Sequence, residues 1–118
     1  WRKVCGGGWR QAGMLAAACL HALDHHVDRL AEDHARAARL AQRLAAIDGP
    51  TVLGQHTNMV FVDVPVDRLR ALDAHLRDAG IRISIGTLPT LRLVTHLDVD
   101  DAGIERTADA FARLFAAR

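Results

Sequence analysis

The stretch Asn58-Met59-Val60-Phe61-Val62-Asp63-Val64 decides the fold class of this chain. Its β-branched and aromatic residues are typical of a strand, and Pro65 ends it. Thr51-Val52-Leu53 forms a shorter candidate strand before it, and residues 91–95 form a further one after it. The sequence therefore predicts a small sheet that begins only near the middle of the chain.

Two helices are expected before this sheet. Residues 9–23 are rich in Ala, Leu and Met and nearly uncharged, which predicts a buried helix. Apolar residues then recur at three-to-four spacing from Val27 to the stop at Gly49-Pro50. This pattern places His34 on the apolar side of the second helix, where we expect it to pack.

Helical and extended segments alternate in the rest of the chain. Residues 66–79 predict a third helix, and an extended stretch begins at residue 81. A last helix is expected after Asp100, whose short side chain suits an N-cap. This order predicts an α/β or α+β fold in which helices cover one face of the small sheet.

The bulk properties narrow the class of protein and its partners. At 118 residues the chain suits one domain, and it begins at Trp1 without an initiator Met, so we expect a fragment of a longer polypeptide. No stretch approaches the roughly 18 apolar residues of a membrane span, and no membrane partner is expected. The net charge is +1 and arginines alternate with acidic residues, so nucleic acid is not an expected partner either.

Arg92 is the residue that best indicates chemistry. Period-two alternation in the run Thr90-Leu91-Arg92-Leu93-Val94-Thr95-His96 sends Arg92, Val94 and His96 to one face of a strand. A guanidinium buried in such an apolar run is costly unless a carboxylate or a phosphate meets its donors. Two interpretations stay open: Arg92 binds an anionic ligand, or it forms an internal ion pair with a carboxylate such as Asp63.

A second candidate site is the glycine run Gly6-Gly7-Gly8, which Lys3 and Arg10 bracket and which leads into a helix. Backbone amides and cations at a helix start suit an anion such as phosphate, whereas a simple hinge explains the glycines equally well. Lys3 is the only lysine and so the only side-chain amine able to form a Schiff base. Its polar end segment favours a contribution of charge instead.

Other candidates have simpler explanations. His21 and His25 are four residues apart, but no third zinc ligand is evident, so we expect solvated imidazoles and no metal. Cys5 and Cys19 are the only cysteines; reduced thiols are expected, and Cys19 suits a small buried hydrophobe better than a nucleophile. For His96, which precedes Asp98 and Asp100, capping and turn formation are favoured over proton transfer.

Four stretches stand out in combination: Gly6-Gly7-Gly8-Trp9-Arg10-Gln11-Ala12-Gly13, Glu32-Asp33-His34, Thr57-Asn58-Met59-Val60-Phe61-Val62 and Arg92-Leu93-Val94-Thr95-His96-Leu97-Asp98-Val99. In this order and at these separations, they resemble the low-specificity threonine aldolases of the β-eliminating lyase group. The resemblance covers nearly the whole chain and corresponds to the C-terminal third of such an enzyme.

The resemblance implies a fold-type I pyridoxal-phosphate enzyme, of which this chain would supply the C-terminal small domain. Residues 1–24 would form the glycine-rich loop and an interdomain helix, and residues 25–118 the small domain, with the N-terminal large domain missing. The implied reaction is cleavage of L-threonine or L-allo-threonine to glycine and acetaldehyde, with the cofactor ring accepting electrons. A cytoplasmic homo-oligomer, dimer or tetramer, is the implied state of the parent protein.

The resemblance also assigns roles to individual residues. Arg92 matches the arginine that grips the substrate α-carboxylate, and Lys3 and Arg10 match cationic positions near the cofactor phosphate. The family's Schiff-base lysine and catalytic histidine lie upstream of this chain, so we expect no catalytic residue here and no activity from the fragment alone. Trp9 stands where the family usually has Met. The alternatives are another fold-type I lyase or aminotransferase, or a non-catalytic module that binds an amino acid or dimerises.

Overall fold

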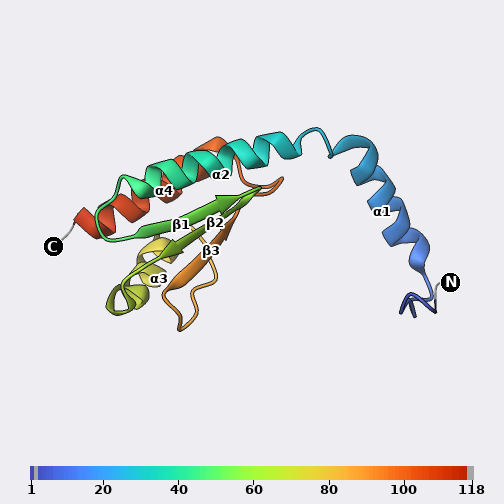
Figure 1. Ribbon diagram of the computed structural model, residues 1–118, viewed down its shortest axis with the longest axis horizontal. Coiled ribbons are helices and arrows are strands. Elements are labelled where there is room, and N and C mark those ends of the chain that lie inside the picture. The colour runs from blue at the N-terminus through green and yellow to red at the C-terminus, as the bar shows by residue number, and fades with distance from the viewer. Residues whose placement is uncertain (2, 117–118) are drawn as a thin grey trace. The chain divides into compact units, whose positions relative to one another are not determined.

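The computed structural model describes Trp1 and residues 3–116 (Figure 1). The chain divides into two compact units, Trp1–Leu30 and Ala31–Arg118. Among the described residues, no helix is long and apolar enough to cross a membrane.

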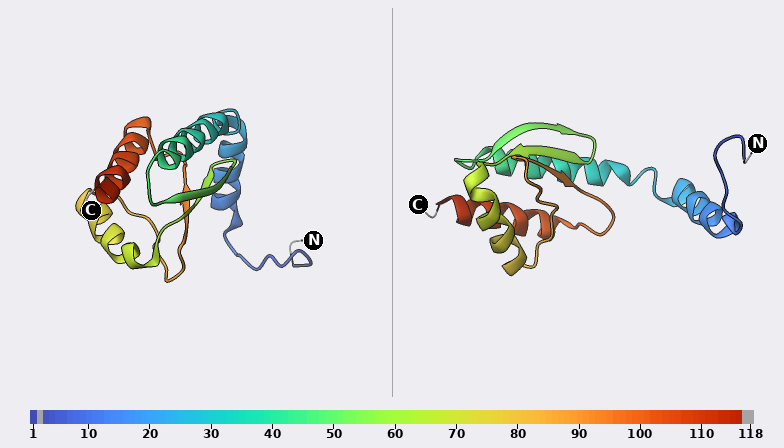
Figure 2. Two further views of the ribbon diagram at one scale, coloured as in Figure 1. Left: turned by 60° about the vertical axis from the view of Figure 1, so that its left-hand side comes forward. Right: turned by 90° about the horizontal axis from the view of Figure 1, so that it is seen from below.

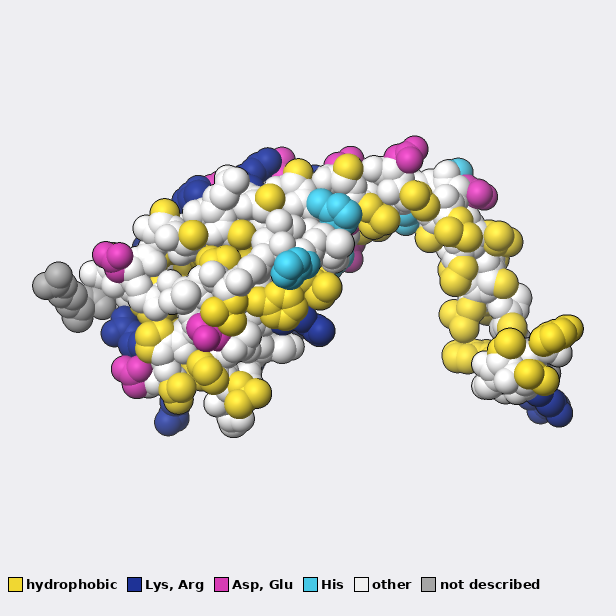
Figure 3. Space-filling model, viewed as in Figure 1, with side chains coloured by type: hydrophobic (Ala, Val, Ile, Leu, Met, Phe, Trp, Pro, Cys, Tyr) yellow, Lys and Arg dark blue, Asp and Glu magenta, His cyan; other side chains and the backbone are white. Residues whose placement is uncertain are grey.

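The first unit consists of a glycine-containing turn and one helix, α1 (Ala12–His25). Helix formation in this segment is confirmed, but the predicted burial is wrong, because no residue of α1 is buried. Within this unit α1 has no second helix or sheet to pack against, and Met14 is 83% exposed. Apolar side chains therefore lie along its surface, as Figure 3 shows.

The second unit is built on an antiparallel sheet, with β1 (Thr51–His56), β2 (Met59–Asp63) and β3 (Thr90–Val94) in that order. Thr57 and Asn58 form the tight turn between the first two strands, and Thr57 takes a positive φ of 52° there. Because both strand pairs are antiparallel, the unit is α+β rather than α/β.

Helices cover one face of this sheet, as predicted (Figure 2). They are α2 (Leu30–Ala45), the short 3-10 helix η1 (Val66–Arg68), α3 (Leu69–Asp78) and α4 (Asp101–Ala116). One hydrophobic core joins them to the sheet, with residues including Leu40, Leu44, Val60, Val62, Leu72, Leu76, Leu91, Leu93, Ile104 and Phe111. Among the described residues of this unit, no helix covers the opposite face of the sheet.

The packing prediction for His34 is wrong. His34 is exposed, and the core-facing stripe of α2 is instead Asp33, Ala37, Leu40 and Leu44. The neighbouring Asp33 takes the core-facing position: it is 3% exposed, and its carboxylate lies 3.6 Å from the Arg36 guanidinium.

Ion pairs connect α2 to α4, which run side by side in both figures. Arg36 donates a hydrogen bond of 3.0 Å to Asp101, and this contact raises the pKa of the guanidinium above its usual value. One turn further along α2, Arg39 also lies near Asp101, and Arg43 pairs with Glu105 and Asp109. These partly exposed pairs fix the relative register of the two helices more than they stabilise them.

Candidate functional site

Strand β3 places Arg92 on a defined face of the sheet. Leu91, Leu93 and Thr95 are buried against the core, whereas Arg92, Val94 and His96 are exposed. The prediction that these last three residues share a face is therefore confirmed. Arg92 lies opposite Phe61 of β2.

The expected burial of Arg92 is wrong, because the sheet face from which it projects is not covered within this unit. The alternative of an internal ion pair with Asp63 is not what the structure has: Asp63 accepts a hydrogen bond from the Thr90 hydroxyl instead. Among the described residues, no ion pair or hydrogen bond involves the Arg92 guanidinium. Its donors are thus available to an anion from outside these residues.

Two polar side chains anchor the end of β3 that follows Arg92. The side-chain amide of Asn58 donates to the backbone carbonyl of Thr95 at 2.7 Å, and the backbone amide of Thr95 donates to the backbone carbonyl of Asn58 at 2.9 Å. Thr95 is buried, with 2% of its surface exposed. Its hydroxyl donates to the backbone carbonyl of Asp33 in α2 at 2.7 Å. These bonds tie the strand to the hairpin turn and to α2, and so fix the position of Arg92.

Replacing Thr95 with valine tests this anchor. Valine has nearly the same shape, so the expected loss of about 1 kcal/mol in the free energy of unfolding comes from the missing hydroxyl donor. Chemical denaturation of the variant and the unmodified chain measures it. Thr107→Val on α4 is the control, because its hydroxyl bonds only within its own helix. Equal stabilities of the Thr95 variant and the unmodified chain would contradict the anchor.

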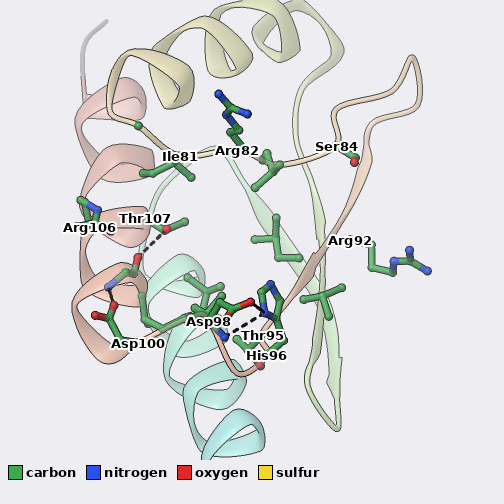
Figure 4. Close-up of a pocket in the computed structure, with 18 of the residues that line it drawn as sticks. Ile81, Arg82, Ser84, Arg92, Thr95, His96, Asp98, Asp100, Arg106 and Thr107 are labelled. Carbon is green, nitrogen blue, oxygen red and sulfur yellow. Dashed lines mark hydrogen bonds and ion pairs between the residues drawn. The ribbon is translucent and has the colours of Figure 1, made fainter. Parts of the chain in front are cut away.

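A cleft of about 700 Å³ runs along the outer edge of β3 (Figure 4). Residues 80–84 line one side, residues 92–96 line another, and α4 contributes Ile104, Arg106 and Thr107. The Arg92 side chain points away from the other labelled residues of the cleft. Arg92 therefore borders the cleft by its backbone, while its guanidinium lies on the outer face of the sheet.

His96 and the two aspartates after it form a turn and a helix cap, as the simpler interpretation predicts. The Asp98 amide donates to His96 Nδ1 at 3.3 Å, and both side chains are exposed. Asp100 accepts a hydrogen bond of 2.7 Å from the Gly103 amide, which confirms the N-cap of α4. Turn formation and helix capping therefore account for the positions of His96, Asp98 and Asp100 without a role in proton transfer.

Lys3 and Arg10 lie in the first unit, and Arg92 lies in the second. Both cations are exposed, and Gly6, between them, has a positive φ of 83° in a turn closed by its bond to the Lys3 carbonyl. This open, cationic turn suits a phosphate group. Because Lys3 is exposed, the described residues include no desolvated lysine amine that could react with the aldehyde of pyridoxal phosphate.

Three histidines lie close together at the end of α1. The rings of His25 and His26 lie 4.4 Å and 5.4 Å from that of His21, in edge-on contact. Across the part of the chain that the structure describes, no group of three potential ligands has a geometry that would hold a metal ion. Cys5 and Cys19 are free thiols, and Cys19 is exposed rather than buried as predicted, since no residue of α1 is buried.

At the start of a strand, Asn58 is expected to fix a loop through side-chain bonds to its own backbone, but its side chain bonds to Thr95 instead. The anchoring role of Thr95 was not predicted. A hydroxyl residue at a core-facing position of a strand was the available signal for Thr95, since a buried hydroxyl requires a hydrogen-bond partner. The partner itself, a backbone carbonyl of α2, is a feature of tertiary packing and leaves no mark in the sequence.

Comparisons with known proteins agree with the resemblance. The chain is 44% identical over its full 118 residues to a low specificity L-threonine aldolase of Escherichia coli strain K12, and covers 34% of that protein. It is 35% identical, over 97% of its length, to a probable low-specificity L-threonine aldolase 2 of Arabidopsis thaliana, of which it also covers 34%. The chain thus spans about a third of the length of these curated relatives.

The family comparison covers more than half of the chain. The model of the family described as "Beta-eliminating lyase" matches residues 1–67, which include the glycine turn, α1, α2 and the hairpin of β1 and β2. The chain belongs to the beta-eliminating lyase family.

Proposed function

We propose that this chain is the C-terminal part of a pyridoxal-phosphate-dependent threonine aldolase, which cleaves L-threonine or L-allo-threonine to glycine and acetaldehyde. The observation that carries the proposal is the 44% identity, over the whole chain, to a relative named for this activity. The exposed Arg92, without an ion pair among the described residues, supports it from the side of the structure.

Arg92 is the proposed binding residue for the substrate α-carboxylate. Its planar guanidinium can donate two parallel hydrogen bonds to a carboxylate, which fixes orientation as well as position. Fixing the carboxylate sets the rotation of the substrate about Cα, and so decides which bond to Cα is broken. When bound, pyridoxal phosphate supplies the ring that accepts the electrons of that bond.

Lys3 and Arg10 are the proposed cationic neighbours of the cofactor phosphate. Their exposure on both sides of the Gly6 turn supports this role. The exposed apolar surface of α1 supports a position between this chain's small domain and the rest of the parent polypeptide. We further propose a division at residues 1–24 and 25–118, and a parent enzyme that is a cytoplasmic dimer or tetramer.

The proposal is tested by product analysis of the parent polypeptide, purified with pyridoxal phosphate and supplied with L-threonine or L-allo-threonine. Acetaldehyde and glycine in equal amounts are the expected products. An oxo acid with ammonia would indicate an elimination, and an oxo acid with an aminated cofactor would indicate an aminotransferase. Either of these results, or the absence of any product, would overturn the threonine aldolase proposal.

The 118-residue chain alone is expected to be inactive and to retain no cofactor. Lys3 is exposed, whereas a lysine that forms a Schiff base is activated by desolvation in an apolar pocket. After the chain is mixed with pyridoxal phosphate and dialysed, its absorbance spectrum should show no bound cofactor. A visible band that survives dialysis in the unmodified chain and disappears in Lys3→Arg would contradict this expectation.

A further inference from the structure

The outer edge of β3 has backbone groups with no strand beside them. β3 is the last strand of the sheet, and the bonds Thr95 N to Asn58 O and Val64 N to Pro89 O fix which of its residues pair with β2. By this alternation, residues 91, 93 and 95 bond to β2, and the amides and carbonyls of Arg92 and Val94 point to the free edge. Within the described residues no hydrogen bond satisfies them.

Segment 81–85, Ile81-Arg82-Ile83-Ser84-Ile85, has the pattern of a strand that would fit this edge. Its three isoleucines are half-buried and pack against the core, while Arg82 and Ser84 are exposed. The segment nevertheless has no regular secondary structure. It therefore presents one apolar face to the core and one polar face outward, as a strand of this sheet does.

The cleft described above separates the segment from β3. Residues 80–84 line it on one side and residues 92–95 on the other. In the sequence, residues 86–89 connect segment 81–85 to β3. Unpaired strand edges are unfavourable, and proteins commonly cover them. Closing the cleft would satisfy the backbone groups of Arg92 and Val94 without changing which side chains face the core.

We propose that segment 81–85 closes onto the free edge of β3 as a fourth, antiparallel strand, and that this closure assembles an anion site around Arg92. The isoleucines must face the core together with Leu91 and Leu93. A shift of one residue would turn them to the other face, so the allowed registers differ from one another by two residues. One of them sets Arg82 directly opposite Arg92, and like charges in that position repel. The other sets Ser84 opposite Arg92 and Arg82 opposite Val94, and is the register we infer.

In this register the Cβ atoms of Ser84 and Arg92 lie about 5 Å apart, and both side chains project from the outer face of the sheet. Arg82 is the diagonal neighbour of Arg92 on the same face. The Arg92 fork, the Ser84 hydroxyl and the Arg82 charge then converge on one point. Such a group suits a carboxylate, for which Ser84 and Arg82 become determinants of binding besides Arg92. The strand pairing stands on its own, whereas the identity of the anion rests on the proposed function.

Amide hydrogen exchange in the 118-residue chain tests the pairing. The Arg92 and Val94 amides should exchange at least about tenfold more slowly than unprotected amides. Ser84→Pro removes the N–H that faces β3 and should abolish this protection. Ile85→Pro, whose lost N–H faces away from β3, should retain it. The Leu93 amide, bonded to β2, reports that each variant is folded. Unprotected Arg92 and Val94 amides in the unmodified chain would overturn the proposal.

The anion site is tested by titrating the same chain with glycine, and with glycinamide, which lacks the carboxylate, while following the side-chain Nε–H signals of Arg82 and Arg92 by NMR. Glycine alone should shift both signals, and Ser84→Ala should weaken its binding by about tenfold without loss of amide protection. A shift of Arg92 that Ser84→Ala leaves unchanged would overturn the assembled site but not the role of Arg92. Protected amides with no response to glycine would overturn the carboxylate role of Arg92 but not the pairing.

Discussion

Replacing Gly49 with alanine is expected to lower the free energy of unfolding by about 3 kcal/mol. Gly49 has a φ of +119°, a conformation that residues with a Cβ rarely adopt. A Cβ added there would also lie 2.5 Å from Cδ1 of Phe115, which packs against the core. Backbone strain and steric overlap therefore add at one position, between the end of α2 and the start of the sheet.

Gly80→Ala is the matched control for this prediction. Gly80 also has a positive φ, +73°, but nothing lies within 4 Å of the position its Cβ would take. Only the backbone strain remains, so the expected loss is about 1 kcal/mol. Thermal and urea denaturation of both variants measures the difference. Equal losses in the two variants would show that the contact between Gly49 and Phe115 does not constrain the fold.

Replacing Arg92 with lysine in the parent polypeptide is expected to raise KM for L-threonine by about 100-fold. Lysine retains the charge but not the planar pair of donors, so a loss in this variant measures the geometry of the site rather than its charge. Steady-state kinetics of retro-aldol cleavage provides the measurement. Arg113→Lys is the control, because Arg113 is an exposed arginine in the last turn of α4. A near-normal KM for L-threonine in the Arg92→Lys variant would contradict the proposed role of Arg92.

Local sequence rules were sufficient for features that depend on near neighbours in the chain. The alternation of residues 90–96 predicted the shared face of Arg92, Val94 and His96, and a short acidic side chain predicted the cap at Asp100. The helices around the sheet followed from their apolar periodicity. In these cases the neighbours in sequence are also the neighbours in space.

Burial could not be predicted in the same way. An apolar helix such as α1 and an arginine in an apolar strand both indicate a covering surface, but neither pattern says which residues provide it. In this chain the described residues bury neither α1 nor the Arg92 side chain. The exposure of His34 is a different case. The helix turns Asp33 rather than His34 toward the core, and the ion pair of Asp33 with Arg36 depends on tertiary packing, which periodicity alone does not indicate.

The role proposed for the Arg92 guanidinium is to bind the carboxylate of the substrate. The most direct test compares kcat/KM for L-threonine and L-threoninamide, which lacks that carboxylate, in the parent enzyme and in its Arg92→Gln variant. The parent enzyme should prefer L-threonine, and the variant should lose about 100-fold of that preference, because it retains nearly all of its activity toward the amide. A preference for L-threonine that the variant retains in full would contradict this role.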